Sequence, residues 1–387
     1  MNDGTDAPAD LYEPEFPEAW DCHSLYGLAV WINGMAFRDI HFASSGTPVI
    51  KIAEVKNGLS GQTKFTRDNY EAKYLLRDGD MLFCWSGQPE TSIDTYWWRG
   101  GSGWLNQHIF KVLPRKELVD RGFFFQLLKY LRPNFVRIAR NKQTTGLGHV
   151  TKADLQRLQV ALPPAEQQRG IAAILGALDD KIESNRTLRR MIWDLLESEY
   201  NSFTIQETRQ PLRNVMRLVY GKALPATKRA GGHVPVYGSN GITGWHDAAI
   251  TDGPTIVVGR KGSIGEVHWS DVPVFPIDTT FYVEPLNDFP LLACYFALRS
   301  AGLRAMNSDS AIPGLNRDRA MSESVRMPSI AVATDWAKRS GPSISESTVL
   351  AAQEAHLVAL RDALIPALMS GRIHVPQGQR RLEGTVA

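Results

Sequence analysis

Arginine, lysine and small polar residues gather in a few glycine-bounded segments of this sequence. The segment Gly259–Gly265 reads Gly-Arg-Lys-Gly-Ser-Ile-Gly and follows an apolar run. It matches neither G-x-x-x-x-G-K-[ST] nor G-x-G-x-x-G, so we do not expect a nucleotide site. A glycine-flanked Arg260–Lys261 pair can instead approach a DNA backbone closely, with Ser263 as a further polar contact, and arginine can read guanine in the major groove. A solvated turn is the alternative interpretation.

A second basic segment, residues 137–145, carries three cations and several amides or hydroxyls. We interpret it as the counterpart, in the first half of the chain, of the glycine-bounded loop. These side-chain types hold phosphates and read base edges. The alternative is the basic face of a helix that ends at Gly146. The residues predicted to bind DNA in this segment are Arg137, Arg140, Lys142, Gln143 and Thr144, and weaker candidates elsewhere are Ser239, Asn240, Arg317 and Arg319.

The sequence predicts neither a catalytic residue nor a metal site. The 9 histidines are scattered, and the 3 cysteines, Cys22, Cys84 and Cys294, have no C-x-x-C spacing. The first residues are acidic rather than basic and apolar, and the longest apolar stretches are far shorter than the roughly 20 residues that span a bilayer. We therefore expect a cytoplasmic protein without a catalytic centre of its own.

The charge distribution is uneven along the 387 residues, a length that suggests two or three domains. Residues 1–20 contain 6 acidic and no basic side chains, whereas residues 21–162 contain 19 basic and 12 acidic ones. We expect residues 1–19 to form an acidic flexible tail. Separated basic surfaces suit a polyanion such as DNA, although an ordinary solvated surface is an alternative.

Two segments have the alternating steps of three and four that are typical of coiled-coil helices. The first helix is expected at 163–208, after Pro163-Pro164-Ala165-Glu166, and would be on the order of 60 Å long. A linker at 331–344 and a second helix at 345–372 are expected near the end. We expect the two to pair antiparallel; packing of each on its own neighbouring domain is the alternative. Their seam positions are Ile171, Leu175, Leu178, Ile182, Asn185, Leu188, Ile192 and Leu195, and Leu350, Gln353, Leu357, Leu360, Leu364 and Ala367.

Asn185 interrupts the first seam. A buried amide at such a position can fix the register of a helix pair at some cost in stability. A polar position at the solvent edge is equally compatible with the sequence, so both interpretations stay open here.

The segments before the two helices resemble each other, which predicts a duplication of one domain. Trp31–Ala36 matches Val219–Leu224, Gly79–Phe83 matches Gly253–Val257, residues 106–112 match 278–284, residues 145–147 match 313–315, and Leu162-Pro163 matches Met327-Pro328. Short β-rich runs such as Thr47–Ala53 alternate with helical segments. The predicted fold class is α+β, with two mixed α/β domains, at 20–162 and 209–330, separated by a pair of long antiparallel coiled-coil helices, and a C-terminal tail at 373–387.

Four motifs resemble those of the specificity subunits of Type I restriction-modification systems. Residues 162–182, which begin Leu-Pro-Pro-Ala-Glu-Gln-Gln-Arg-Gly-Ile-Ala, are similar to that family's central conserved region, and residues 364–373 are similar to its second one. Residues 235–241 and 258–265 resemble segments of its target-recognition domains. Ser329–Pro342 departs from the family pattern, which leaves the start of the second helix undefined.

The resemblance implies two target-recognition domains that each read one half of a bipartite site in double-stranded DNA. It also implies two methyltransferase subunits, bound partly through the conserved helices, and restriction or translocase subunits in the same complex. S-adenosylmethionine, ATP and Mg would then be bound by these partners and no cofactor by this chain. The residues predicted at the subunit interface are Leu175, Leu178, Ile182, Leu188, Ile192, Leu357, Leu360 and Leu364.

Our leading hypothesis is that both domains clamp one DNA duplex while the helices set their distance. A helix pair of about 40 to 60 Å, compared with about 34 to 36 Å per turn of DNA, would place the half-sites about one to one and a half turns apart. Two rival hypotheses are a coiled-coil adaptor that assembles proteins without DNA, which the low net charge of +2 favours, and an enzyme with its own active site.

Overall fold

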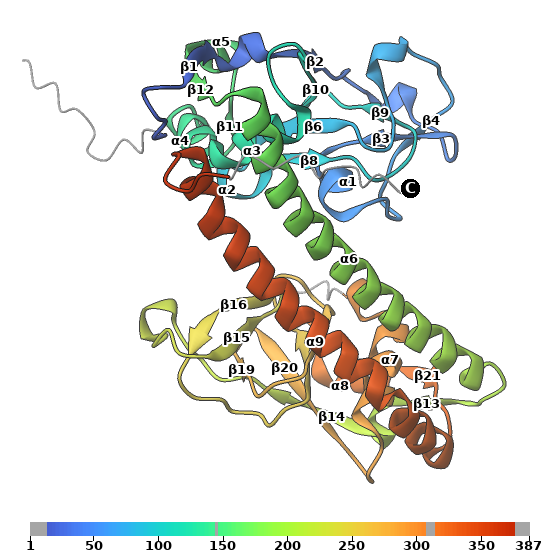
Figure 1. Ribbon diagram of the computed structural model, residues 1–387. Coiled ribbons are helices and arrows are strands. Elements are labelled where there is room, and N and C mark those ends of the chain that lie inside the picture. Colours follow the sequence, from blue (N-terminus) through green and yellow to red (C-terminus); the bar gives the residue numbers. More distant parts are fainter. Residues whose placement is uncertain (1–13, 144–145, 307–313, 376–387) are drawn as a thin grey trace, which may run out of the picture. The chain divides into compact units, whose positions relative to one another are not determined.

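The computed structural model describes residues 14–143, 146–306 and 314–375 and divides the chain into two compact units (Figure 1). Unit 1 comprises Met1–Ile182 and His356–Ala387, and unit 2 comprises Glu183–Ala355. Each unit combines small, mainly antiparallel sheets with helices, so the predicted α+β class is confirmed. Thr144 and residues 1–13 of the predicted tail lie outside the described residues.

The core of unit 1 is a four-stranded antiparallel sheet in the order β2–β10–β6–β8, covered by α3. Asp120 begins α3 because its carboxylate accepts a hydrogen bond from the Phe123 amide at 2.9 Å. A smaller sheet has the order β4–β3–β9–β5. Before the first long helix, the elements are β1 (Asp21–Ser24), η1 (Leu25–Leu28), β2 (Ala29–Asn33), η2 (Asp39–His41), β3 (Thr47–Ile50), α1 (Ile52–Asn57), β4 (Phe65–Thr66), η3 (Ala72–Tyr74), β5 (Leu75–Leu76), β6 (Met81–Cys84), β7 (Ser86–Gly87), α2 (Pro89–Ser92), β8 (Asp94–Trp97), β9 (Gly103–Leu105), β10 (Ile109–Pro114), α3 (Arg121–Tyr130), α4 (Arg132–Asn141), β11 (Gly148–His149), α5 (Lys152–Arg157) and β12 (Gln159–Leu162).

Unit 2 has a corresponding four-stranded sheet in the order β14–β20–β17–β18, with α7 packed on it. Its smaller sheet has the order β16–β15–β19. Between the long helices, the elements are β13 (Arg209–Pro211), η4 (Leu212–Asn214), β14 (Met216–Tyr220), η5 (Ala226–Lys228), β15 (Val234–Gly238), β16 (Gly241–His246), β17 (Thr255–Gly259), β18 (Val267–Ser270), β19 (Phe275–Pro276), β20 (Thr280–Pro285), α7 (Leu291–Ser300), η6 (Leu303–Ala305), α8 (Arg317–Ser322) and β21 (Ser324–Arg326).

The two units repeat one topology, which confirms the predicted duplication. Gly34 of unit 1 and Gly221 of unit 2 are equivalent residues, because their amides donate to the Ile109 and Thr280 carbonyl oxygens, each at 3.1 Å. A Cβ at Gly34 would lie 2.1 Å from a backbone oxygen, and one at Gly221 would lie 2.2 Å from another. Only glycine therefore fits at this point of the fold.

The register of the sequence matches was wrong by one residue. We matched Asn33 with Gly221 and Met81 with Thr255, whereas the ladders make Asn33 equivalent to Tyr220 and Met81 to Ile256. A slip of one residue exchanges the two faces of a strand, so the distinction decides which side chains are comparable. The later match of residues 145–147 with 313–315 was also wrong. The Val150 and Leu315 amides, which donate to the Trp85 and Arg260 carbonyls, are the equivalent pair.

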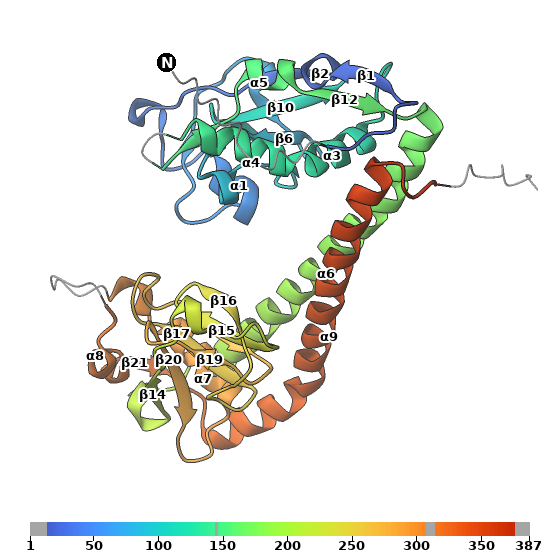
Figure 2. The same cartoon turned by 90° about the vertical axis from the view of Figure 1, so that its left-hand side faces the viewer.

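The two long helices are α6 (Ala165–Thr204) and α9 (Ile330–Met369), and each contributes residues to both units. Within unit 1, Arg361 of α9 pairs with Asp179 of α6 at 3.0 Å. Within unit 2, Ser347 bonds to Trp193 at 3.0 Å, and Glu199 of α6 accepts from Trp336 at 2.9 Å. The pairing is antiparallel in each unit, and Figure 2 shows the two helices side by side.

The expected linker at 331–344 is instead helical, because α9 already begins at Ile330. Gly341-Pro342 locally disfavours a helix here, since proline lacks a donor and clashes with the preceding turn. Packing overrides this local preference. Ala333 and Trp336 are fully buried in the unit 2 core, and the Trp336 indole donates to Glu199.

The predicted seam of α6 holds as far as Asn185. Beyond it Ile192 still packs against the unit 2 core, but the predictions of Leu188 and Leu195 were wrong by one position. Leu188 and Leu195 are 45% and 57% exposed, while Arg189 is partly buried and Leu196 is buried. The error arose because the seam contains charges, which an apolar pattern passes over. Arg189 pairs with Glu354 at 3.1 Å, and Arg361, rather than the 41% exposed Leu360, faces α6.

Asn185 is completely buried, so the solvent-edge interpretation is excluded. Its side-chain amide donates to Gln353 Oε1 at 3.3 Å, and Asn185 Oδ1 is buried without a partner among the described residues.

The described part of the predicted flexible tail packs against unit 1. The Phe16 ring lies 5.8 Å from the Tyr130 ring, and the Glu15 amide donates to the Tyr130 hydroxyl at 3.1 Å. At the other end of the chain, Val375 packs against the same core. Within the described ranges, no helix has both the length and the apolar character that a membrane span needs.

Candidate nucleic-acid interface

Two polar loops of unit 2 lie against each other at the ends of β15 and β17. Gly259 allows this approach, because a Cβ there would lie 2.1 Å from the Ser263 carbonyl oxygen and 3.1 Å from that of Ser239. The Ser239 hydroxyl donates to the Thr279 carbonyl at 2.6 Å and holds the first loop in place. The structure thus brings together five predicted residues, namely Ser239, Asn240, Arg260, Lys261 and Ser263.

A hollow of about 400 Å³ separates the tips of these loops. Asn240 and Lys261 are exposed at its rim. Among the described residues, neither the Lys261 ammonium nor the Asn240 amide has a hydrogen-bonding partner. A free cation beside an amide and a hydroxyl can hold a phosphate group. The lining residues are Gly238, Ser239, Asn240, Gly241, Ile242, Thr243, Lys261, Gly262, Ser263, Ile277 and Thr279.

Arg260 is held on an aromatic surface. Its guanidinium lies 4.9 Å from the centre of the Tyr220 ring and 5.9 Å from that of Phe281. Its Nη1 donates to the Asp278 carbonyl at 2.9 Å. The Arg260 carbonyl accepts from the Leu315 amide at 2.8 Å, so backbone and side chain are both restrained.

Arg317 joins the same group of side chains, whereas Arg319 does not. The Arg317 guanidinium lies 5.4 Å from the centre of the Tyr220 ring and pairs with Asp318 at 3.2 Å. The Arg319 side chain is exposed, and its backbone amide donates to Asn316 Oδ1 at the start of α8. Tyr220 was not predicted from the sequence; its place directly before the constrained Gly221 is the only signal that marks it.

The predicted residues of unit 1 lie on and just after α4. Arg140 is exposed and forms an ion pair with Glu90. Arg137 is partly buried, and its Nη1 has no partner among the described residues. Gln143 is exposed, and its amide donates to the Gly146 carbonyl at 2.7 Å. These side chains therefore do not form a single cluster comparable with that of unit 2.

Lys142 has a structural contact of its own. Its ammonium lies 2.6 Å from Oδ1 of the buried Asp154. Burial by itself would raise the pKa of Asp154, but hydrogen bonds from Lys142 and Thr151 outweigh it and hold that pKa below its usual value. Since Asp154 and Thr151 also form the capping box of α5, Lys142 stabilises the start of a helix.

The interpretation of residues 137–145 as the counterpart of the Gly259–Gly265 loop was wrong. The sheet register makes Trp85 equivalent to Arg260, because Cys84 and Gly259 occupy the same place opposite β10 and β20. The Trp85 ring lies 5.8 Å from Phe110, and its indole nitrogen donates to Asn33 Oδ1 at 3.0 Å. Trp85 and Asn33 are thus the unpredicted equivalents of Arg260 and Tyr220.

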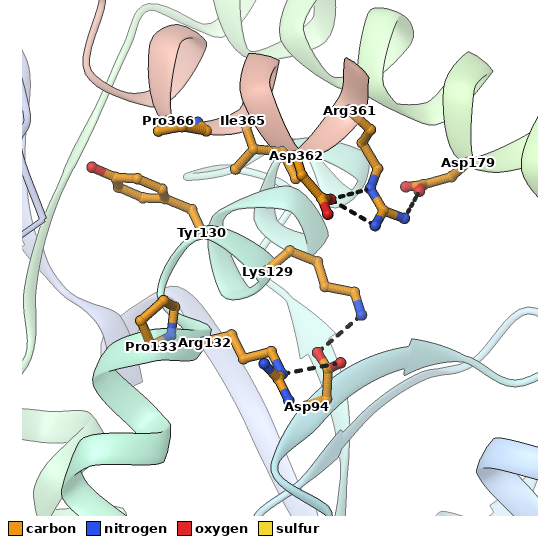
Figure 3. A pocket seen from close by; sticks show the side chains of 10 residues that line it. All are labelled: Asp94, Lys129, Tyr130, Arg132, Pro133, Asp179, Arg361, Asp362, Ile365 and Pro366. Atoms are coloured by element: carbon orange, nitrogen blue, oxygen red, sulfur yellow. Dashed lines mark hydrogen bonds and ion pairs between the residues drawn. The ribbon is translucent and has the colours of Figure 1, made fainter. Parts of the chain in front are cut away.

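The charged side chains that line the cleft of unit 1 in Figure 3 form ion pairs with one another. Lys129 and Arg132 point toward Asp94, at 2.9 and 3.3 Å, and Arg361 points toward Asp179 and Asp362, at 3.0 and 2.7 Å. Burial would lower the pKa of Arg361, but its two carboxylate partners raise it. Each cation of the cleft has a carboxylate partner, so this arrangement stabilises the helix pair of unit 1 and leaves no cation free for a ligand.

Several of the predicted subunit-interface residues are used inside the chain. Leu175 and Ile182 are buried, and Leu178 and Leu364 pack partly against the unit 1 core. Ile192 packs against the unit 2 core, and Leu357 is partly buried. Leu188 and Leu360 remain 45% and 41% exposed, and these two are accessible to another subunit.

Two kinds of group in the part of the chain that the structure describes bear on catalysis, namely metal-ligating side chains and cysteine thiols. No three His, Cys, Asp or Glu side chains there are placed to hold a metal ion. Burial raises the pKa of the Cys84 and Cys294 thiols, which disfavours the nucleophilic thiolate.

Comparison with known proteins finds similarity to the first part of the chain. The family model described as "Type I restriction modification DNA specificity domain" matches residues 17–192. The MjaVIII specificity subunit of a Type I restriction enzyme from Methanocaldococcus jannaschii is 26% identical to the chain over 183 residues, covering 45% of this chain and 39% of that protein. The putative MjaX specificity subunit from the same organism is 36% identical over 176 residues, covering 43% and 41%.

The matches to these relatives span about two fifths of their length. The crystal structure of a Type I restriction-modification S subunit from M. genitalium covers 90% of this chain and 96% of its own, with a TM-score of 0.54 and 18% identity. That likeness extends the similarity of fold beyond residues 17–192. The family resemblance inferred from the motif at 162–182 is confirmed.

Proposed function

We propose that this chain is the DNA-specificity subunit of a Type I restriction-modification complex. Unit 1 and unit 2 each bind one half of a bipartite duplex site, and partner subunits carry out methylation and cleavage. The observation that carries the proposal is the repetition of one scaffold in two units, in a chain whose residues 17–192 match the specificity-domain model. The restrained Arg260 and the free Lys261 of unit 2 support contact with a polyanion.

The long helices set the distance between the half-sites in this proposal. An α-helix of 40 residues is about 60 Å long, compared with about 34 to 36 Å for a turn of DNA. The unread gap between half-sites then follows from helix length and not from side-chain chemistry. Removing two heptads from α6 and from the facing part of α9 changes the required gap and leaves both half-sites unaltered.

The partners in the proposal are two methyltransferase subunits and, through them, restriction or translocase subunits. S-adenosylmethionine, ATP and Mg are bound by those partners and not by this chain. On α6, Leu188, Met191 and Leu195 are 45%, 61% and 57% exposed and lie at steps of three and four, which favours an apolar docking stripe for another helix.

The test is to co-express the chain with the methyltransferase genes that neighbour it and to map methylated adenines across the host genome. A bipartite motif with a fixed gap, absent when the chain is omitted, is the expected result. Methylation that is unchanged without the chain contradicts the proposal.

The rival function is a coiled-coil adaptor that assembles proteins without contacting DNA, which the net charge of +2 favours. The two functions differ in salt dependence. Neutralising several phosphates makes DNA affinity fall steeply with salt concentration, whereas an adaptor shows no specific affinity for duplex DNA at any salt concentration.

A further inference from the structure

We propose that Arg260 reads a guanine in the half-site bound by unit 2 and that Tyr220 positions it. This inference rests on the proposed function and adds the chemistry of one recognition contact. It concerns unit 2 alone, because the equivalent position of unit 1 holds Trp85.

The hydrogen-bonding capacity of Arg260 leaves one edge of the guanidinium open. A guanidinium carries five N–H donors, and the structure uses one of them, from Nη1 to the Asp278 carbonyl. The Nε and Nη2 groups have no hydrogen-bonding partner among the described residues. Their two parallel N–H bonds match the O6 and N7 acceptors that guanine presents in the major groove.

The aromatic surface restrains this edge before DNA binds. Arg260 lies over Tyr220 and Phe281, and its backbone is fixed by the Leu315 amide. Restraining the side chain in advance reduces the conformational entropy that binding would otherwise cost. Tyr220 is itself 46% exposed, so the surface stands at the boundary with solvent.

The local charges favour an electron-rich partner. Arg260 and Arg317 lie over the same ring, at 4.9 and 5.4 Å from its centre. Arg317 has Asp318 as an ionic partner, but Arg260 has no carboxylate partner among the described residues. A cation that is ordered and uncompensated beside another cation suits the negative potential and acceptor groups of a DNA groove.

The same position of unit 1 lacks this capacity. Trp85 has a single polar hydrogen, and it donates that hydrogen to Asn33. It therefore has no donor pair for guanine. The asymmetry between the units makes the inference specific to one half of the site.

The experiment measures binding of the complex of this chain with its methyltransferase subunits to duplexes that carry the mapped motif. Each G·C pair is replaced in turn by A·T, and each guanine by 7-deazaguanine, which lacks N7. For one guanine of one half-site, we expect the A·T replacement to weaken binding by about 5- to 150-fold and the 7-deazaguanine replacement to weaken it less. Arg260→Lys keeps the charge but lacks the paired donors, so the loss at that position should fall to within about threefold.

Tyr220 is tested as a positioning residue. Tyr220→Phe retains the ring and should preserve discrimination at the same guanine, whereas Tyr220→Ala should lower discrimination without changing the salt dependence of binding. Arg339→Gln is the matched control, because Arg339 is an exposed arginine paired with Asp335 on α9. It should leave every base preference unchanged.

The outcomes separate this inference from the proposed function. If Arg260→Lys binds as well as the unmodified chain and still discriminates at every guanine, or if Arg260→Gln weakens all sequences equally and flattens the salt dependence, Arg260 does not read guanine. A bipartite methylation motif remains in either case. If the unmodified complex has no bipartite motif at all, the proposed function fails instead.

Discussion

The four-stranded sheets β2–β10–β6–β8 of unit 1 and β14–β20–β17–β18 of unit 2 share order and register, whereas the loops at their strand ends differ. Ile50 and Tyr237 occupy equivalent positions, since their carbonyls accept from the Asn106 and Ile277 amides. After Ile50 the chain forms helix α1, while after Tyr237 it forms the turn that carries Ser239. The loops that follow Cys84 and Gly259 differ in the same way. The comparison teaches that strand pairing in the sheet determines the position of each loop side chain, and that the loop sequence determines the chemistry at that position.

The largest predicted effects concern the start of each long helix. The Gln168 amide donates to the Pro164 carbonyl at the start of α6, and the Ala333 amide donates to the Ser329 carbonyl at the start of α9. Ile171 and Trp336 each lie three residues after these donors, so they are equivalent, and both are fully buried. Ile171→Ala should cost about 2 to 5 kcal/mol and Trp336→Ala about 3 to 5 kcal/mol. Hydrogen exchange along the full chain should show faster opening in unit 1 for the first variant and in unit 2 for the second. If either variant accelerated hydrogen exchange equally in both units, the division of the chain into two separate folding units would be contradicted.

An intermediate effect is expected at the Lys142–Asp154 pair. Lys142→Met leaves a buried carboxylate without its cation and should cost about 1 to 2 kcal/mol, since Lys142 is itself 35% exposed. Because the pKa of Asp154 is lowered by folding, its contribution is present above the unfolded pKa of about 4 and is lost as the pH falls through the folded pKa. Denaturant unfolding between pH 2 and pH 7 should show a smaller loss on acidification in the variant.

Unit 2 supplies the control for this pair. Arg319 occupies the position of Asp154, at the third residue of the equivalent helix, and its side chain is exposed. Arg319→Met should change the free energy of unfolding by less than about 0.5 kcal/mol. A loss as large as that of Lys142→Met would mean that the two helices are stabilised in the same way.

A smaller effect of opposite sign is expected at Asn185, whose equivalent in the second helix is the buried Leu350. Asn185→Leu removes a buried oxygen that has no partner and should raise the free energy of unfolding by about 1 kcal/mol. Denaturant unfolding of the full chain measures this. A destabilisation would indicate that the amide, and not its burial, holds the seam together.

The smallest effect is expected at Lys261, which has no equivalent cation because unit 1 places Ser86 there. Lys261→Gln should weaken DNA binding to a similar extent for all sequences and reduce the slope of log affinity against log salt by about 1. Titrations at several salt concentrations measure the slope. A loss confined to one base pair would instead place Lys261 in base recognition.

The fold was largely predictable because hydrophobic spacing and repeated motifs report burial directly. The predicted ranges Thr47–Ala53 for β3 and 163–208 for α6 agree with the structure to within a few residues. The start of α9 was not predictable, because burial of Trp336 outweighs the local signal of Gly341-Pro342. The seam beyond Asn185 was missed for a related reason, since Arg189 and Arg361 occupy it as paired charges.

The candidate site was predictable in its charged residues and not in its aromatic ones. Arg260 and Lys261 are marked by flanking glycines in the sequence. Tyr220, beside Arg260 in unit 2, and Trp85 and Asn33, at the equivalent positions of unit 1, are identified only through the register of the strand ladders, which a one-residue error in the sequence match conceals. Likewise, nothing local in the sequence indicates that Lys142 is engaged by Asp154, because that contact depends on how α4 and α5 pack.

Unit 1 is encoded by two stretches of chain, Met1–Ile182 and His356–Ala387, and the whole of unit 2 lies between them. Asp179 and Arg361, a few residues from the two junctions, are already bonded across the helix pair. Unit 2 is therefore a cassette within unit 1, bounded by two breakpoints that both fall inside continuous helices. A recombination event at those breakpoints would replace one complete folded module and leave every core side chain of its host in place.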